Sequence, residues 1–402
     1  MKYIIVLGDG MADEPLENYD GKTPLQLAGT PEIDRLAKLG RCGRLVTVPD
    51  RMHPGSEIAN MSVLGYDVES VFEGRGTLEA ASMGVKLKEG DLALRCNLIC
   101  IEGEHIKNHS SGHISNEESH ELIDFLNEKL GSKKITFYKG VSYRHLLVIQ
   151  GGKKQMDCTP PHDVPGKPWR EHLVKALSPE AQETAELLND LILKSMNLLP
   201  DHPVNQKRKA AGKDMANSIW PWSPGYKPKM PTLKEMFGIK KAAVISAVDL
   251  IQGIGVYAGM DVIQVEGATG LYNTNYEGKA KATIDALKDH DLVYLHIEAS
   301  DEAGHEGDVE LKTKTIEYLD QRIVKYLVEE TAKMDEPVAI AILPDHPTPC
   351  ATTVHTKDPV PFLIYKPGNV PDKVQVYDEF AVKEGSYGML YGAEFIKALL
   401  EA

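Results

Sequence analysis

The segment from residue 292 to 306 combines an apolar run with side chains that bind metals. The run 292–297 has the near-continuous apolar character of a strand buried on both faces. Asp301 and His305 follow it, four residues apart. Carboxylate and imidazole groups are common metal ligands, and α/β proteins place their sites at the carboxyl ends of the strands. The spacing therefore indicates a metal-binding position behind this strand.

A second segment, nearer the carboxyl terminus, repeats this arrangement. The apolar run 339–343 leads into Asp345 and His346, and His355 follows in a loop rich in proline and threonine. Two late strands thus carry the same ligand types to one edge of the expected sheet, which favours a shared site.

Two earlier positions add a carboxylate and a hydroxyl. Asp9 ends the first apolar run between two glycines, which let the backbone approach a ligand closely. Ser56 follows Gly55 at the start of a segment with helical spacing. A serine hydroxyl needs a base or a metal to become a nucleophile, and a helix start offers N–H groups to an anion. Taken alone, Asp9 could be an ordinary cap of the next turn, and a Gly-Ser pair at a helix start is usually an ordinary cap.

Together these segments contain enough ligands for two divalent cations. Two metal ions about 3.5 to 4 Å apart can polarise a phosphoryl oxygen, activate a hydroxyl and stabilise both ends of an in-line displacement. The set therefore points to phosphoryl transfer. Its members are Asp9, Ser56, Asp301, His305, Asp345, His346 and His355.

The composition is that of a large acidic chain. Its 402 residues exceed the roughly 250 to 300 at which single cores stop growing, so two domains are expected. The formal net charge of -14 disfavours nucleic-acid and anionic-membrane partners. Five scattered cysteines suit free thiols, and we find no signal peptide and no apolar run long enough to span a bilayer. We expect a cytoplasmic protein, and the sequence carries no signal for its oligomeric state.

Strands and helices alternate in the outer parts of the chain. Apolar runs predict strands at 3–7, 292–298, 338–343 and 361–365, and helical spacing predicts helices at 30–39, 314–334 and 393–400. This alternation predicts an α/β fold with a doubly wound, mostly parallel sheet.

The middle of the chain has shorter strands, and its 220–228 segment reads as a connector rich in proline and aromatic residues. Stretches dense in glycine and proline lie at both ends of this middle part of the chain. We therefore expect an inserted α+β cap domain at 81–229, and a catalytic domain formed by 1–80 and 230–402.

The order of these motifs resembles that of the metal sites in the alkaline phosphatase superfamily. Within it, the chain resembles the archaeal type of cofactor-independent phosphoglycerate mutase. The stretches 7–13, 74–76, 111–115, 143–145 and 202–205 add to the likeness, which extends over essentially the whole chain.

The resemblance implies an alkaline-phosphatase-like fold and a two-metal isomerase that does not need 2,3-bisphosphoglycerate. Ser56 would accept the phosphoryl group of 3-phosphoglycerate, and the resulting phosphoserine would return it to the 2-hydroxyl of glycerate. Mn²⁺ suits the mixed ligands, and Zn²⁺, Co²⁺ or Mg²⁺ would also fit. One metal would be held by Asp301, His305 and His355, and the other by Asp9, Asp345, His346 and Ser56.

The cap would contribute positive charge and a proton carrier. Arg144 and Arg208 could bind a phosphate or carboxylate, and Arg75 is near enough in sequence to Ser56 to reach the same site. His113 could carry a proton between the glycerate oxygens.

His162 is a second candidate for that proton transfer. The family usually has Asp-Pro-His here, whereas this chain has Thr159-Pro160-Pro161-His162, which leaves the role of His162 open. Each of these cap side chains could instead be solvated or structural.

The sequence thus favours a glycolytic and gluconeogenic mutase acting on a small molecule, phosphoglycerate. A metal-dependent phosphatase or another phosphomutase of the same superfamily is the first alternative. A noncatalytic relative that keeps the fold and binds a metal or ligand is the alternative of another class.

Overall fold

The computed structural model describes residues 1–401, which divide into two compact units. Unit 1 comprises Met1–Phe72 and the chain from Met230 onward, and unit 2 comprises Glu73–Lys229. The first boundary therefore falls at 72 instead of the expected 80. Helix α5 (Arg75–Ser82) explains the difference, because its Gly76 lies directly against the backbone of Arg95 in unit 2.

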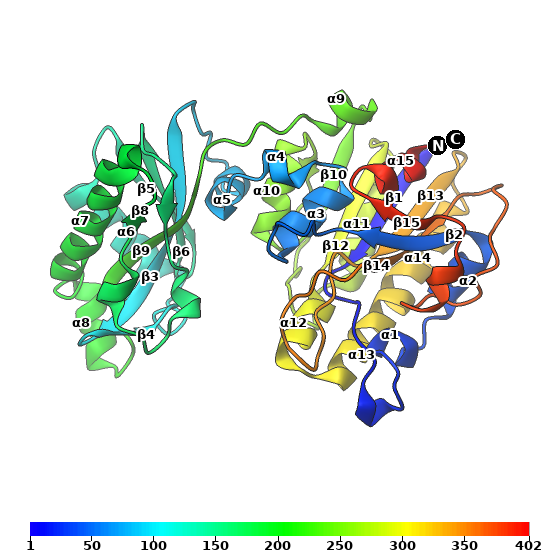
Figure 1. Ribbon diagram of the computed structural model, residues 1–402, viewed down its shortest axis with the longest axis horizontal. Helices are drawn as coiled ribbons and strands as arrows, with labels where there is room; N and C mark the ends of the chain where they lie inside the picture. Colours follow the sequence, from blue (N-terminus) through cyan, green and yellow to red (C-terminus); the bar gives the residue numbers. More distant parts are fainter. Residues whose placement is uncertain (402) are drawn as a thin grey trace. The chain divides into compact units, whose positions relative to one another are not determined.

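The core of unit 1 is an eight-stranded sheet in the order β11-β10-β12-β1-β13-β14-β2-β15 (Figure 1). Neighbouring strands pair in parallel, except that β14 lies antiparallel between β13 and β2. The mostly parallel sheet is therefore confirmed. The strands are β1 (Lys2–Gly8), β2 (Arg41–Val46), β10 (Ala242–Ile245), β11 (Asp261–Val262), β12 (Leu292–Ile297), β13 (Val338–Leu343), β14 (Val360–Tyr365) and β15 (Gly388–Tyr391).

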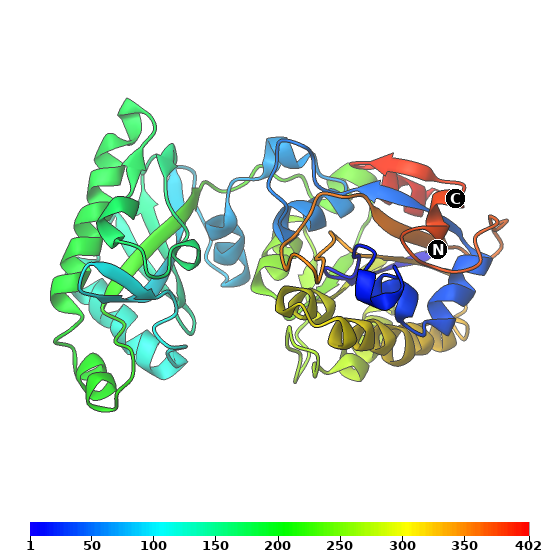
Figure 2. The same ribbon diagram turned by 60° about the horizontal axis from the view of Figure 1, so that its bottom comes forward.

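Helices cover both faces of this sheet, as a doubly wound fold requires (Figures 1 and 2). On one face, Val6 and Leu363 share a core with Leu36 of α2. On the other, Phe362 packs edge-to-face on Phe395 of α15 at a centroid distance of 5.3 Å. The helices are α1 (Pro24–Leu27), α2 (Pro31–Leu39), α3 (Ser56–Val63), α4 (Val68–Val71), α9 (Leu233–Phe237), α10 (Asp249–Tyr257), α11 (Tyr276–Leu287), α12 (Ala299–Glu306), α13 (Val309–Tyr318), α14 (Lys325–Thr331) and α15 (Glu394–Leu400).

Unit 2 is an α+β unit built on a five-stranded antiparallel sheet in which β9 joins β4-β3-β6-β5 through β3. Leu122 of α6 and Leu188 of α7 pack into one core of this sheet, and Ala80 of α5 packs into another. The elements are β3 (Asp91–Glu102), β4 (His105–Asn108), β5 (Ile135–Val141), β6 (Arg144–Gln150), β7 (Met156–Asp157), β8 (Lys175–Ala176), β9 (Ser218–Gly225), α6 (Asn116–Leu130), α7 (Gln182–Leu198) and α8 (Pro203–Ala210).

The expected connector at 220–228 is largely strand β9, so that expectation was wrong. β9 pairs with β3, placing Pro221 opposite Cys96. Proline is tolerated in an edge strand because its missing N–H is not needed on the open side. Trp220 and Trp222 are buried in the unit 2 core, so the aromatic side chains that suggested a loop stabilise a sheet instead.

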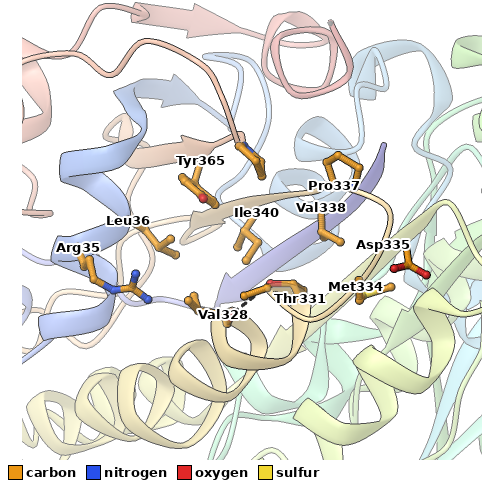
Figure 3. A pocket seen from close by; sticks show the side chains of 12 residues that line it. Arg35, Leu36, Val328, Thr331, Met334, Asp335, Pro337, Val338, Ile340 and Tyr365 are labelled. Carbon is orange, nitrogen blue, oxygen red and sulfur yellow. Dashed lines mark hydrogen bonds between the residues drawn. The ribbon is translucent and has the colours of Figure 1, made fainter.

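A pocket of about 310 Å³ lies at the end of the unit 1 sheet opposite to the predicted site (Figure 3). Val338 begins β13 and lines this pocket, whereas Asp345 follows the other end of the same strand. The pocket is thus at the amino end of β13, and any chemistry carried by Asp345 at the carboxyl end must take place outside it. Across residues 1–401, no helix combines the length and apolarity needed to cross a membrane.

Candidate metal centre

Three neighbouring strands in the middle of the unit 1 sheet end at the same edge, and an aspartate follows each. Because β12, β1 and β13 run parallel, Asp301, Asp9 and Asp345 meet at that edge. The N–H of Gly10 donates to Asp345 Oδ1 at 3.1 Å. Gly10 has a φ of 59°, and a side chain there would meet Asp301 Oδ1 at 2.5 Å. Glycine therefore lets the loop after β1 pass close to both carboxylates.

One ligand group consists of Asp301, His305 and His355. Helix α12 carries the first two one turn apart, and His305 Nε2 lies 3.2 Å from Asp301 Oδ2. His355 comes from the loop after β13, and its Nε2 lies 3.3 Å from Asp301 Oδ1 and 2.9 Å from His305 Nε2. The structure thus brings together the three residues that the resemblance implied for one metal.

The second group consists of Asp9, Asp345, His346 and Ser56. His346 Nε2 lies 3.3 Å from Asp345 Oδ2, 3.6 Å from Asp9 Oδ1 and 3.2 Å from Ser56 Oγ. Ser56 is the first residue of α3, so its hydroxyl lies at the positive end of a helix. The His346 ring stacks on His355 at 3.8 Å, and the two groups therefore adjoin.

Two of the imidazole rings are held by main-chain carbonyl groups. His305 Nδ1 lies 2.8 Å from Thr353 O, and His355 Nδ1 lies 3.4 Å from Pro54 O. A carbonyl oxygen only accepts hydrogen bonds, so each Nδ1 carries a proton, and each Nε2 faces the site, where it can offer a lone pair to a cation once its own proton has been displaced. This orientation is typical of histidines that bind metals.

The electrostatics of the site favour a cation. Burial, followed by the charge of Asp345, raises the pKa of Asp9 well above its usual value. Burial also acts to raise the pKa of Asp301, but hydrogen bonds from His305 and His355 outweigh it and hold this pKa well below the usual range. Asp9 Oδ1 is buried without a hydrogen-bond partner. A buried carboxylate oxygen among other carboxylates is stabilised by a bound cation, so the residues fit divalent metals.

His296 and Glu298, at the end of β12, also face Asp9 and were not predicted. His296 Nε2 lies 2.7 Å from Asp9 Oδ2, and its Nδ1 lies 3.1 Å from Ser246 Oγ. Burial lowers the pKa of His296 to about 3, so the neutral ring donates to Asp9. Burial, and then Asp301, raises the pKa of Glu298 to about 8. The one imidazole within the 292–297 run was the signal that could have identified this pair.

Unit 2 gathers three histidines around two aromatic side chains. The Tyr143 ring lies 6.3 Å from His113 and 5.8 Å from His109. His162 lies 6.2 Å from His109 and 5.2 Å from Trp222. His113 and His162, both selected from the sequence, therefore belong to one cluster. The side chains that join them were not predicted as site residues; these are His109, Tyr143 and Trp222.

Positive charge accompanies this cluster. Burial, and then the charges of Arg144 and Arg75, lowers the pKa of Arg95 in spite of its ion pair with Glu79 at 3.2 Å. The Arg95 guanidinium lies 5.0 Å from the Trp222 ring centroid. Burial, and then the charges of Arg95 and Arg75, lowers the pKa of His162 against the opposing charge of Asp163. Cations that depress one another's pKa in this way are stabilised by a bound anion. Arg95 escaped prediction because it lies inside a buried strand.

Arg208 is buried and anchors the loop that carries His113. Its Nη2 donates to Ser111 O at 2.6 Å, its Nε donates to Asp214 O at 2.8 Å, and its Nη1 pairs with Glu118. Every guanidinium nitrogen is thus engaged within unit 2, whereas the sequence suggested that Arg208 could bind a phosphate or carboxylate. Ser111 and His113 have φ of 51° and 52°, a left-handed conformation that costs about 1 to 3 kcal/mol per residue and requires such support.

These features define an α/β protein with a doubly wound sheet, an α+β insertion and two clusters of candidate metal ligands at the carboxyl edge of the sheet. Residues 37–205 match the family model described as 2,3-bisphosphoglycerate-independent phosphoglycerate mutase. Proteins of that name from Methanosarcina mazei and Methanosarcina barkeri are each 49% identical to this chain over 404 residues, covering 100% of both sequences. The chain belongs to the 2,3-bisphosphoglycerate-independent phosphoglycerate mutase family.

Solved structures agree with this membership. A protein from Pyrococcus horikoshii superposes with a TM-score of 0.84 at 31% identity, covering 99% of this chain and 96% of that one. The cofactor-independent phosphoglycerate mutase from Thermoplasma acidophilum gives a TM-score of 0.69 at 28% identity, covering 100% and 99%. The similarity therefore includes both units.

Proposed function

We propose that the protein interconverts 3-phosphoglycerate and 2-phosphoglycerate by two phosphoryl transfers through Ser56. The observation that carries the proposal is the position of Ser56 Oγ, 3.2 Å from His346 Nε2 at the start of α3. A hydroxyl placed there can act as a nucleophile, and the helix start stabilises the phosphate it receives. Membership of the mutase family supports this direction over simple hydrolysis.

The two ligand groups are proposed to hold two divalent cations. Mn²⁺ suits mixed carboxylate and imidazole ligands, and Zn²⁺, Co²⁺ or Mg²⁺ would compete for the same positions. When bound, the cations would lower the pKa of the serine hydroxyl and neutralise charge on the phosphoryl oxygens. The first set is Asp301, His305 and His355, and the second is Asp9, Asp345, His346 and Ser56.

The cycle balances without any further phosphate donor. Ser56 Oγ forms a bond to phosphorus as the bond from phosphorus to O3 of the substrate breaks, and the hydroxyl proton is transferred to O3. This step gives phosphoserine and glycerate. The O2 hydroxyl of glycerate then forms a bond to phosphorus, the bond to Ser56 Oγ breaks, and the O2 proton returns to Oγ. The same residues therefore serve both halves of the reaction.

Unit 2 is proposed to be the substrate-binding cap. His113 would relay the proton to O3 in the first transfer and from O2 in the second, and Arg75, Arg144 and His162 would bind the carboxylate or phosphate. The mutual effects of these charges on the pKa values of Arg95 and His162 support this role. Arg208 is left out of the proposed contacts, because its nitrogens are already engaged.

A cytoplasmic location is also proposed. All five cysteines are free thiols, four of them buried, as expected in a reducing compartment.

Product analysis tests the reaction. Purified protein with Mn²⁺ and 3-phosphoglycerate should form mainly 2-phosphoglycerate, and added chelator should stop the reaction. Mainly free phosphate would instead indicate a phosphatase, and no product would indicate either a mutase for another substrate or a noncatalytic protein. Any of these outcomes would overturn the proposed activity.

The nucleophile has its own test. Mass spectrometry of substrate-treated protein should find phosphoserine at Ser56, and Ser56→Ala should lower kcat by roughly 10³-fold or more. Ser62→Ala is the matched control, because Ser62 is buried in the same helix and lies outside both ligand groups. A Ser56→Ala protein with wild-type activity would rule out the covalent route.

A further inference from the structure

Thr348 fills a space that two glycines leave open beside the candidate metal centre. Its side chain is fully buried. A Cβ at Gly10 would meet Thr348 Oγ1 at 2.6 Å, and a Cβ at Gly304 would meet Thr348 O at 2.5 Å and Cγ2 at 2.9 Å. Thr348 therefore packs against both the loop after β1, which carries Asp9 of the second group, and helix α12, which carries Asp301 and His305 of the first.

The hydroxyl of Thr348 reaches both ligand groups. Oγ1 lies 2.5 Å from Asp301 Oδ1 and 3.3 Å from His346 Nδ1. A carboxylate oxygen accepts hydrogen bonds, so the hydroxyl proton is directed to Asp301. The oxygen lone pair is then left for the N–H at His346 Nδ1, and His346 Nε2 faces Ser56 without a proton.

This arrangement distinguishes His346 from the other two candidate histidine ligands. His305 and His355 place their Nδ1 atoms against main-chain carbonyl groups, which no substitution can remove. His346 instead depends on a side chain that also binds Asp301. The tautomer of a residue in one group is thereby linked to a carboxylate in the other.

We propose that Thr348 is a positioning residue that couples the two metal-binding groups. This role rests on the proposed function. The Thr348 hydroxyl holds Asp301 Oδ1 toward the first group, and it fixes His346 with Nε2 toward the second. A cation that orders Asp301 also orders Thr348 and His346, so occupation of one group should favour occupation of the other. The coupling should disappear when the hydroxyl is removed.

Three substitutions isolate the hydroxyl. Thr348→Val keeps the shape and removes it, Thr348→Ala removes it without crowding the two glycines, and Thr348→Ser retains it. Thr283→Val is the matched control, because Thr283 is equally buried in unit 1 and donates only to the main chain of α11. The alanine variant keeps the test usable if the valine variant does not fold.

Two measurements do not depend on turnover. In metal-free protein labelled with ¹⁵N-histidine, the His346 signal, identified by its loss in His346→Gln, should show a protonated Nδ1 in wild type, Thr348→Ser and Thr283→Val. In Thr348→Val or Thr348→Ala that tautomer should no longer dominate. Calorimetric titration with Mn²⁺ should show affinity about 10-fold or more weaker for these two variants, with the second binding event no longer favoured by the first.

The outcomes separate this proposal from the proposed function. The role of Thr348 would be overturned if both hydroxyl-free variants kept the wild-type tautomer of His346 and bound Mn²⁺ within twofold of the wild-type affinities. It would also be overturned if Thr348→Ser were as impaired as Thr348→Val. Failure of wild type to form 2-phosphoglycerate would overturn the mutase activity alone, because the tautomer and titration results would still stand.

Discussion

The side-chain amide of Asn60 donates a hydrogen bond of 2.8 Å to Asp345 Oδ2. The same amide nitrogen donates to the main-chain oxygen of Ser56 at 2.8 Å, and Asn60 Oδ1 accepts from the Tyr294 hydroxyl at 2.5 Å. Asn60 therefore fixes the distance between a candidate metal ligand and the candidate nucleophile. Its own orientation is set by Tyr294, because the hydroxyl can be donated only to the amide oxygen.

Tyr294→Phe should disturb this link without changing any proposed ligand. The buried Asn60 Oδ1 would lose its donor, which should lower the free energy of unfolding by about 1 to 3 kcal/mol. Released from that bond, Asn60 would hold Asp345 less precisely, and kcat for 3-phosphoglycerate should fall by about 10-fold. Urea unfolding and a coupled activity assay measure the two effects.

Tyr377→Phe is the matched control for this variant. Tyr377 is also buried in unit 1, and its hydroxyl donates to Pro361 O at 2.8 Å, away from the ligand groups. Both substitutions should lower stability, but only Tyr294→Phe should lower kcat. Equal kcat values in the two variants would show that Asn60 needs no help from Tyr294.

Substitutions of Arg144 and Arg208, two of the arginines selected from the sequence, should have different effects. Arg144 is exposed at the start of β6, so Arg144→Ala should leave stability unchanged and raise the KM for 3-phosphoglycerate about 10-fold. Arg208→Ala would leave Glu118 and Ser111 O without their donor, and should lower the free energy of unfolding by about 2 to 3 kcal/mol. Urea unfolding and KM measurements on both variants check this. If Arg208 were the substrate ligand instead, Arg208→Ala would raise KM and leave stability unchanged.

Glu379 predicts a pH dependence of stability separate from the metal centre. Its Oε1 accepts from the N–H of Asp13 at 3.0 Å and its Oε2 from Thr23 Oγ1 at 2.8 Å, and burial raises its pKa to about 7. Between the usual value of 4.5 and about 7, the folded chain keeps a proton that the unfolded chain has lost. The free energy of unfolding should therefore fall as pH rises through this window, by at most about 1.4 kcal/mol per pH unit from this group.

Glu379→Gln should remove this contribution. Urea unfolding with chelator at about pH 5, 6, 7 and 8 should give a flatter profile than wild type, with the variant relatively more stable at the upper end. Glu14→Gln changes an exposed carboxyl group next to Asp13, the residue whose N–H Glu379 accepts, and should keep the wild-type profile. If Glu379→Gln followed the wild-type profile as well, the raised pKa would not be a property of the folded protein.

The sequence identified most of the candidate ligands because they follow apolar strands and, for Asp301 and His305, share one turn of a helix, whereas Ser56 was selected from the start of a helical segment. Their convergence depends on β12, β1 and β13 being neighbours, an order that periodicity alone cannot reveal. The division of the seven residues between two cations came only from the family resemblance.

The supporting residues could not be predicted, because their roles arise from contacts between distant parts of the chain. Asn60 and Asp345 are 285 positions apart, and Asn60 and Tyr294 are 234 apart. At Arg208, residue type suggested an anion-binding group, and its engagement within unit 2 could not be read from the sequence. Its guanidinium is buried because three oxygen atoms of unit 2 surround it.

Binding of a divalent cation should release protons. In the metal-free protein, burial raises the pKa of Asp9 well above its usual value and that of Glu298 to about 8, and the hydrogen bond to Asp301 raises the pKa of His305 to about 9. These groups therefore keep protons near neutral pH. A cation favours the ionised carboxylates and neutral imidazole and displaces these protons, so more of them should be released at pH 6.5 than at pH 8.5, and affinity should rise with pH.

Anaerobic titration with Mn²⁺ in buffers of different ionisation enthalpy counts the protons at each pH. Glu298→Gln should release fewer than wild type at the lower pH, since an amide has no proton to lose, while Glu306→Gln, on the exposed end of α12, should match wild type. The same linkage makes the cation more stabilising as pH rises, because the metal-free fold must then hold several ionised carboxylates together. A proton count that is the same at both pH values, or unchanged by Glu298→Gln, would mean that these carboxyl groups are already ionised before the metal binds.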